Sequence, residues 1–157
     1  MAKKPEKERW EHWLALCRRH RITKPKRIAI DLSFTQAQFE KIKQGFLPDA
    51  MEDKWVIYYS KGTVYFHRSW TGHRMYKAKI TRHENGYAIR EFYVERNQNR
   101  YRNTDDNEDV ATFAFLIANL LGVDARSILI SPEMGEFDAL KLWSTFGRMI
   151  FRPEDYK

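Results

Sequence analysis

Two histidines and two arginines flank a predicted tight turn, and side chains of these types could bind an anion. His67 and Arg68 precede Thr71-Gly72, and His73 and Arg74 follow it. Paired arginines are a common fork for phosphate, because each planar guanidinium can donate two parallel hydrogen bonds. We therefore expect a phosphate site at this turn. Its expected ligand-binding residues are Arg68, Arg74, His67, His73 and Trp70.

The predicted faces of the strands leave three interpretations of the two arginines open. Alternation of side chains along a strand places Arg68 and Arg74 in rows whose apolar members indicate that they face the core. An arginine cannot be deprotonated in a protein, and burying it alone is costly. The two side chains therefore reach solvent at the end of the sheet, pair with carboxylates, or line an anion pocket. The candidate carboxylates are Glu91, Asp31 and the acids of the C-terminal helices.

Charge along the chain alternates between basic and acidic segments. The 157 residues carry a net charge of +7, with +7 in residues 1–27, −2 in 28–60, +7 in 61–102 and −5 in 103–157. Either these segments neutralise each other across the folded surface, or the basic ones form a face for a polyanion. The second interpretation leads to our first functional hypothesis, a binding module for a phosphate-rich ligand, either nucleic acid or a nucleotide.

Basic and aromatic residues interleave along the predicted strands, in a pattern typical of a stacking platform for single-stranded nucleic acid. Tyrosine is common in strands in any case, so the pattern also fits an ordinary sheet. Met75, Lys77, Lys79 and Thr81 form one row, which we expect to face solvent. Lys77 and Lys79 are therefore candidate ligand-binding residues. Arg18 and Arg19, at the end of a predicted N-terminal helix, join them.

A small metal-dependent nuclease or hydrolase is the second hypothesis, and whether the protein is an enzyme stays open. Glu52-Asp53-Lys54 precedes a strand, as acid-x-lysine does in nucleases whose carboxylates hold Mg²⁺. The same triplet also fits the solvated start of a strand. His67 and His73 could meet across the turn as an acid/base pair. The catalytic candidates are Glu52, Lys54, His67 and His73.

We expect neither a bound metal nor a cofactor. The five histidines have no metal-ligand spacing, and the chain has no glycine-rich phosphate loop or nucleophile elbow. The third hypothesis is a protein-interaction component or an inhibitor in a bacterial assembly. It predicts an apolar surface patch, and the helix that carries Trp10 and Trp13 is one place for it if that helix does not dock on the core.

Two stretches resemble a signature of small, uncharacterised bacterial proteins. They are Met51-Glu52-Asp53-Lys54-Trp55-Val56-Ile57-Tyr58-Tyr59 and Phe66-His67-Arg68-Ser69-Trp70-Thr71-Gly72. The resemblance covers roughly residues 46 to 109. It implies no role for any residue, because no activity is established for that family.

Four short runs of β-branched and aromatic residues must position these side chains. They span 55–59, 63–70, 73–82 and 87–96, and a glycine lies in each separator between them. Asn85-Gly86 is the strongest hairpin pattern of the three. The sequence therefore predicts an α+β protein with a four-stranded antiparallel β-meander over 55–96 and residues 27–32 as a candidate fifth strand.

Helices are predicted on both sides of this meander. A basic amphipathic helix spans about 6–19, and a second spans 34–44 behind a capping box of Ser33 and Gln36. C-terminal helices over about 104–121 and 131–151 are expected to pack against the sheet. We expect one domain, 1–157, with a basic helical segment at 1–26 and an α+β core at 27–157.

The chain is expected to be soluble and cytoplasmic, with no membrane partner. Its only cysteine is Cys17, so no disulfide framework can form. No apolar run approaches the roughly 20 residues of a membrane span. The charged residues at the start have no apolar segment behind them, unlike a secretory signal.

Overall fold

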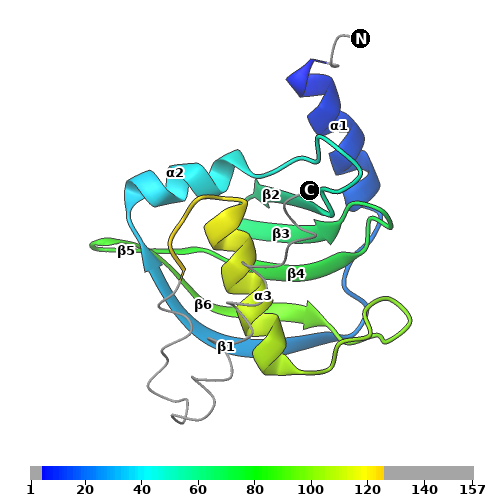
Figure 1. Ribbon diagram of the computed structural model, residues 1–157. Coiled ribbons are helices and arrows are strands. Elements are labelled where there is room, and N and C mark those ends of the chain that lie inside the picture. Colours follow the sequence, from blue (N-terminus) through cyan, green and yellow to red (C-terminus); the bar gives the residue numbers. More distant parts are fainter. Residues whose placement is uncertain (1–4, 126–157) are drawn as a thin grey trace.

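The computed structural model describes residues 5–125, which form three helices and one six-stranded antiparallel sheet (Figure 1). The α+β class is therefore confirmed, whereas the predicted helix over 131–151 lies outside the described residues. None of the helices in this part of the chain has both the length and the apolar character needed to cross a bilayer. The elements are α1 (Glu6–Cys17), β1 (Pro25–Phe34), α2 (Gln36–Gln44), β2 (Trp55–Ser60), β3 (Thr63–Arg68), β4 (Arg74–Lys79), β5 (Thr81–His83), β6 (Gly86–Glu95) and α3 (Asp106–Asn119).

The strands lie in the order β1-β6-β4-β3-β2, and the short β5 pairs with β6. The predicted meander is therefore present as β2, β3, β4 and β6, and β1 is the fifth strand. The predicted strand over 73–82 is divided into β4 and β5 at Ile80, whose N–H donates to the Gly62 carbonyl oxygen. A hairpin turn joins β5 and β6 as predicted, but it consists of Glu84 and Asn85, because Gly86 already belongs to β6 and pairs with His83.

The main core lies between the sheet and α3, which crosses the front of the sheet in Figure 1. Phe113 of α3 stacks on Phe92 of β6 with ring centroids 4.4 Å apart and also contacts Phe66 of β3. α3 is buried on most of its surface because its sequence is apolar nearly all round. The prediction that this helix packs against the sheet is confirmed.

The helix α1 docks on the opposite face of the sheet, over β2 and β3. Cys17, Val56 and Tyr58 form a second buried cluster there, and Trp10 and Trp13 pack against it. The tryptophan stripe of α1 is thus its docking face, because burying these large side chains contributes most of the favourable free energy of docking. α1 covers only one end of this face, and no other helix within residues 5–125 lies over the rest (Figure 1).

The predicted capping box before α2 is wrong by two residues. The cap is Thr35, whose side chain accepts a hydrogen bond from the N–H of Gln38, and the Gln38 side chain accepts one from Thr35 N–H. The strand β1 continues to Phe34, which is 5% exposed and stacks on Tyr87. Burial of this ring extends the strand past Ser33 and moves the start of the helix.

A β-bulge at Met75 overturns the predicted faces of β4. Phe66 pairs with Tyr76 but His67 pairs with Arg74, so Met75 has no partner in β3. A bulge places one extra residue in a strand and reverses the faces of the residues beyond it. Arg74 therefore lies on the α1 side of the sheet and not in the row of Tyr76. Met75, predicted to face solvent, is 1% exposed.

Candidate nucleic-acid interface

Aromatic and cationic residues alternate across four strands on the sheet face that lies opposite α3. Tyr65 of β3 pairs with Lys77 of β4, Lys77 with Tyr93 of β6, and Tyr93 with Arg27 of β1. Side chains directly opposite each other in an antiparallel pair point to the same face. We call Tyr65, Lys77, Tyr93 and Arg27 the cross-strand row. The area around it that α1 leaves uncovered is the open face.

Contacts along the cross-strand row join rings to cations. Lys77 Nζ lies 5.5 Å from the centroid of the Tyr93 ring, and the guanidinium carbon of Arg74 lies 4.2 Å from that of Tyr65. Both tyrosines are half-buried, and Arg27 is exposed and ion-paired with Glu91. The row therefore presents flat apolar surface beside positive charge.

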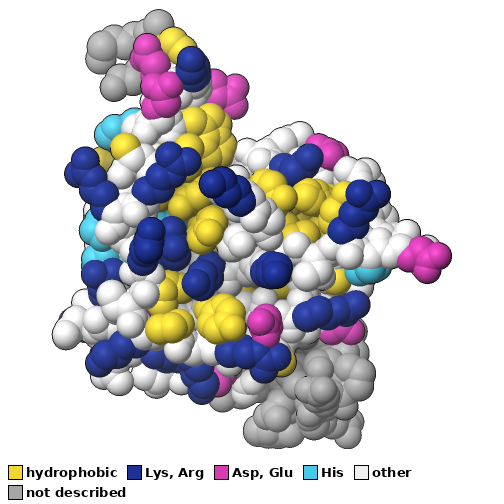
Figure 2. All heavy atoms as spheres, turned by 180° about the vertical axis from the view of Figure 1, so that it is seen from behind, with side chains coloured by type: hydrophobic (Ala, Val, Ile, Leu, Met, Phe, Trp, Pro, Cys, Tyr) yellow, Lys and Arg dark blue, Asp and Glu magenta, His cyan; other side chains and the backbone are white. Residues whose placement is uncertain are grey.

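Positive charge predominates on the open face. Figure 2 looks onto it and shows Lys and Arg side chains spread among hydrophobic ones, with few acidic groups between them. Lys77 is half-buried and Lys79 is exposed, and neither is ion-paired with any of residues 5–125. Arg90 pairs with Asp31, so part of the charge is balanced. Of the predicted solvent-facing row, Lys77, Lys79 and Thr81 do reach solvent, with Met75 as the exception.

Arg74 is fixed in the corner between α1 and the cross-strand row. Its Nε donates a hydrogen bond to Nε2 of His67 at 3.2 Å, and its Nη2 donates one to the hydroxyl of Tyr58 at 3.2 Å. Burial raises the pKa of Tyr58, and Arg74 opposes that shift. The tyrosine thus stays a neutral acceptor. Two neutral acceptors and the Tyr65 ring hold the guanidinium in one position.

His67 is fully buried and has no ring nitrogen free for catalysis. Its Nδ1 donates to the Gly72 carbonyl oxygen at 2.8 Å, which leaves Nε2 as the acceptor for Arg74. Burial lowers the pKa of His67 to about 4, so the ring is neutral near pH 7. His73 lies instead edge-on to His20, with ring centroids 5.4 Å apart. The two histidines therefore have separate partners in the structure and separate environments.

Arg68 lies on the other face of the sheet, which is a correction to the expected two-arginine fork. Its guanidinium covers the Trp55 ring at 4.9 Å, and Trp55 stacks on the core residue Tyr76. Arg74 contacts Tyr58 and His67 on the α1 side. Within residues 5–125 neither arginine is ion-paired with a carboxylate. The proposed internal pairs with Glu91 and Asp31 belong to Arg27 and Arg90.

Trp70 belongs to a different surface, at the tip of the β3–β4 connection. Its side chain is 70% exposed, that of Met51 is 74% exposed, and Trp70 Nε1 donates to the Met51 carbonyl oxygen. Both line a groove of about 490 Å³ together with Trp13 and Pro48. Trp70 is therefore part of an exposed apolar groove and not of the cross-strand row.

The proposed catalytic acid and lysine lie in the loop before β2. Glu52 and Lys54 are exposed, and the part of the chain that the structure describes shows no contact between them and His67 or His73. The Asp53 carboxylate accepts hydrogen bonds from the N–H groups of Asp49 and Ala50, so it shapes the loop. The described residues therefore do not bring the proposed catalytic side chains together in one site, as the enzyme hypothesis requires.

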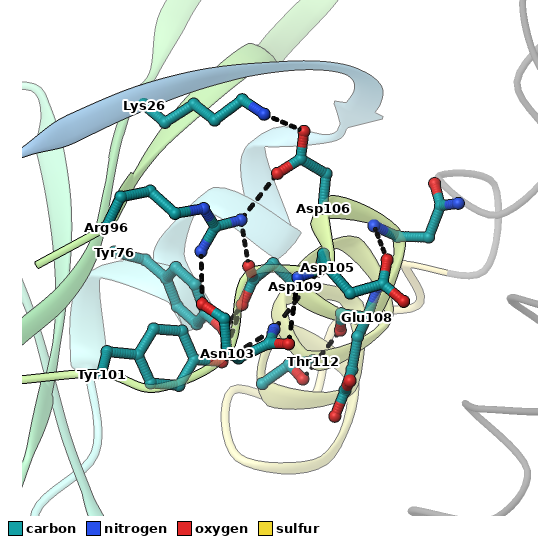
Figure 3. Close-up of polar contacts among 11 residues, drawn as sticks. Lys26, Tyr76, Arg96, Tyr101, Asn103, Asp105, Asp106, Glu108, Asp109 and Thr112 are labelled. Carbon is teal, nitrogen blue, oxygen red and sulfur yellow. Dashed lines mark hydrogen bonds and ion pairs between the residues drawn. The ribbon is translucent and has the colours of Figure 1, made fainter. Parts of the chain in front are cut away.

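A buried polar network anchors the start of α3 (Figure 3). The carboxylate of Asp109 is fully buried and accepts hydrogen bonds at 2.7 Å from the hydroxyls of Tyr76 and Tyr101. Arg96 donates to Asp109 at 2.5 Å and to Asp106 at 2.7 Å. Burial and the Asp109 charge raise the pKa of Tyr101 to about 12. Every side chain of this network has hydrogen-bond partners within the protein, so we assign the network a structural role.

Several residues of these sites escaped prediction. Glu95 and Asp109 are buried carboxylates that the sequence shows only as a strand-end acid and a helix-start acid. Tyr65 and Tyr93 are aromatic residues of the predicted strands, and their residue type alone does not distinguish them from the other tyrosines there. Their alignment with Lys77 depends on the bulge at Met75 and on a register shift between β5 and β4, so counting residues from the turns does not reveal it. The bulge at Met75 left no mark in the sequence that could have reassigned Arg74.

Comparison with protein-family models, with curated proteins and with solved structures found no match to this chain.

Proposed function

We propose that the open face binds single-stranded nucleic acid. The observation that carries this proposal is the cross-strand row, in which Tyr65 and Tyr93 alternate with Lys77 and Arg27 in register across four strands. Proteins that bind single strands combine a positive surface for the backbone with flat groups on which bases stack. The open face has both, and Arg74, Lys77 and Lys79 have no internal carboxylate partner among residues 5–125.

The arrangement favours a single strand over a duplex. Bases in a duplex are stacked on each other, so aromatic side chains on a flat sheet cannot reach their faces. Tyr93 is half-buried in the middle of the open face, with Lys77 5.5 Å from its ring centroid. A base over Tyr93 would bring its flanking phosphates near Lys77. The planar guanidinium of Arg74 on Tyr65 is a second surface on which a base could stack.

The direct test is fluorescence anisotropy with labelled single-stranded and duplex oligonucleotides of the same sequence at rising salt concentration. We expect tighter binding of the single strand. If three or four phosphates are contacted, the logarithm of the binding constant should fall against the logarithm of salt with a slope of roughly −2 to −3. Absence of binding, or binding without salt dependence, would contradict the proposal.

Variants distinguish the open face from general basicity. Tyr93→Ala should weaken binding by about 5- to 150-fold, since stacking on one aromatic contributes about 1–3 kcal/mol per base. Tyr93→Phe keeps the ring and should bind nearly as the wild type does. Lys77→Gln should reduce the salt slope by about 0.7, the share of one phosphate.

Lys41→Gln is the matched control, because Lys41 is an exposed lysine on α2, away from the open face. It removes the same charge and should leave the salt slope unchanged. If Lys41→Gln and Lys77→Gln weaken binding equally, attraction is diffuse and the open face is not the site.

A protein partner is a second candidate, and the exposed groove favours it. Monomeric proteins rarely fix a tryptophan in an exposed position beside other apolar groups, and tryptophan is enriched in binding hot spots. The loop beside Trp70 and Met51 carries the acids Glu52 and Asp53, whereas its Asp49 is paired with Arg9. Charge complementarity therefore points to a partner segment with one large apolar side chain and flanking basic residues.

Peptides of that composition test this candidate, with Trp70 fluorescence and calorimetry as measurements. Binding of a basic peptide with an apolar anchor should be lost in Trp70→Ala and kept in Lys77→Gln. Equal binding of an acidic peptide with the same anchor would exclude the charge argument.

A further inference from the structure

Among the arginines of residues 5–125 whose guanidinium is hydrogen-bonded to another side chain, Arg74 is the one without a carboxylate partner. The side chain of Arg96 is 14% exposed and donates to two carboxylates, those of Asp106 and Asp109. Arg9 is paired with Asp49. Arg74 is likewise half-buried, but its hydrogen-bond acceptors are an imidazole nitrogen and a phenol oxygen. A partly buried charge is normally paired, so this corner would stabilise a negative group.

The hydrogen bonds of Arg74 leave donors unused. A guanidinium has five N–H donors, of which one on Nε points at His67 and one on Nη2 at Tyr58. The other three have no acceptor in the described part of the chain. Because the Tyr65 ring also supports the group from one side, little side-chain entropy would be lost when a ligand binds.

The surroundings of Arg74 include the end of α1, two histidines and the cation Arg100. Gly72 lies so close to α1 that an added Cβ would be 2.9 Å from His20 Cδ2, which places the end of α1 against the turn. His73 contacts His20 and feels the charge of Arg100. One acid, Glu95, is close enough to act on His73, but its oxygens accept four hydrogen bonds from Thr23, Lys24 and Asn97.

We infer that Arg74 holds a phosphate group, through the donors that the protein leaves unused, in the corner between α1 and the cross-strand row. A phosphate oxyanion supplies the negative charge and accepts two parallel N–H bonds from one guanidinium. His67 acts as a positioning residue, because its neutral Nε2 orients the guanidinium. The phosphate can be an internal phosphodiester or a terminal phosphomonoester. Its place on a nucleic acid strand rests on the proposed function, whereas phosphate binding itself does not.

The first experiment uses the wild-type protein and pyrophosphate as the probe. In nitrogen-15 NMR spectra, pyrophosphate should shift the Nε–H resonance of Arg74 and the ring resonances of His67. The exposed Arg82 on β5 serves as the internal reference and should shift little. Shifts of equal size at both arginines, or none at Arg74, would overturn the inference without any variant having to fold.

The second experiment compares Arg74→Lys with Arg82→Gln. Arg74→Lys keeps the charge but loses the planar fork, so we expect pyrophosphate to bind at least about tenfold more weakly. Arg82→Gln should bind as the wild type does. The free energy of unfolding of each variant is measured alongside, so that loss of fold is recognised. Unchanged pyrophosphate binding by a folded Arg74→Lys variant would overturn the inference.

Oligonucleotides with and without a 5′-phosphate separate the two sources of the phosphate. A preference for the 5′-phosphate that disappears in Arg74→Lys assigns the site to a chain end. Equal affinity for both, reduced equally by Arg74→Lys, assigns it to an internal phosphate. Pyrophosphate binding through Arg74 without oligonucleotide binding would refute only the proposed function. Oligonucleotide binding that depends on Tyr93 but not on Arg74 would refute only this inference.

Discussion

The imidazole of His67 accepts a hydrogen bond at Nε2 from Nε of Arg74, 3.2 Å away. A protonated ring could not accept this bond, and it would place a second buried positive charge beside the guanidinium. The folded protein therefore requires the neutral ring, with its proton on Nδ1 and directed at Gly72.

The free energy of unfolding should consequently decrease as the pH is lowered through a window set by the pKa of His67. Its pKa is about 4 in the folded protein and near 6.5 in the unfolded chain, so between these values the unfolded chain binds more protons. The stabilisation by the neutral ring is complete above pH about 6.5 and is lost as the pH falls toward 4. The largest loss is about 3 kcal/mol, from 1.36 kcal/mol per unit of pKa. Urea denaturation of wild type and His67→Gln from pH 7 to 4 measures it as the difference between the two curves. A difference that stays constant with pH would contradict a buried neutral ring.

Replacing Asp109 should destabilise the protein far more than replacing Asp106. Asp109→Asn removes a fully buried carboxylate that Tyr76, Tyr101 and Arg96 share, and the expected loss is about 2–4 kcal/mol. Asp106 is 37% exposed, so Asp106→Asn should cost less than about 1 kcal/mol. Urea denaturation at pH 7 gives both values. Similar losses in the two variants would show that the network is not the anchor of α3.

Alanine at Gly72 should displace the end of α1. Gly72 has φ +78°, and an added Cβ would lie 2.9 Å from His20 and 3.0 Å from Leu16. Gly62 has φ +85° with open space around it, so Gly62→Ala carries only the backbone strain, about 1 kcal/mol. Gly72→Ala should cost about 2–3 kcal/mol, since overpacking is added to the strain. Near-ultraviolet circular dichroism, to which Trp10 and Trp13 contribute among the aromatic residues, should change in Gly72→Ala and stay as in the wild type in Gly62→Ala.

Glu95 should control the loop that leads from α1 into β1. Its buried carboxylate accepts the N–H groups of Thr23, Lys24 and Asn97, and these bonds lower its pKa against the effect of burial. Glu95→Gln turns one acceptor into a donor that faces other donors, at an expected cost of about 1–3 kcal/mol. Hydrogen exchange at Thr23 and Lys24 should accelerate while the amides of α3 keep their protection. Acceleration throughout the protein would mean that the loss is global.

The strands of the meander and the helices could be predicted because local chemistry fixes them. Lys61-Gly62 both adopt positive φ in the turn between β2 and β3, a conformation that glycine favours. The apolar run over 110–117 could only be a buried element. The long stretch of β-branched and aromatic residues likewise required a sheet. The periodicity of apolar residues and the residues at the turns were thus sufficient to predict the architecture.

The faces and partners of the site could not be predicted in the same way. One extra residue at Met75 moves Arg74 to the other side of the sheet, and the residue types around Met75 do not predict a bulge. Asp109 stands among acids that suit any helix start, and only the distant Arg96 and Tyr76 distinguish it. Such roles depend on contacts between residues far apart in the sequence.

The strand β1 also has a consequence for self-association. It forms one edge of the sheet, and an exposed edge with unpaired N–H and C=O groups is a template for pairing with another chain. Charged side chains at Lys26, Arg27 and Asp31, and the irregular register between Ala29 and Leu32, interrupt that template. Arg27, which belongs to the proposed ligand surface, thus also helps to keep one copy of the sheet from extending into the next.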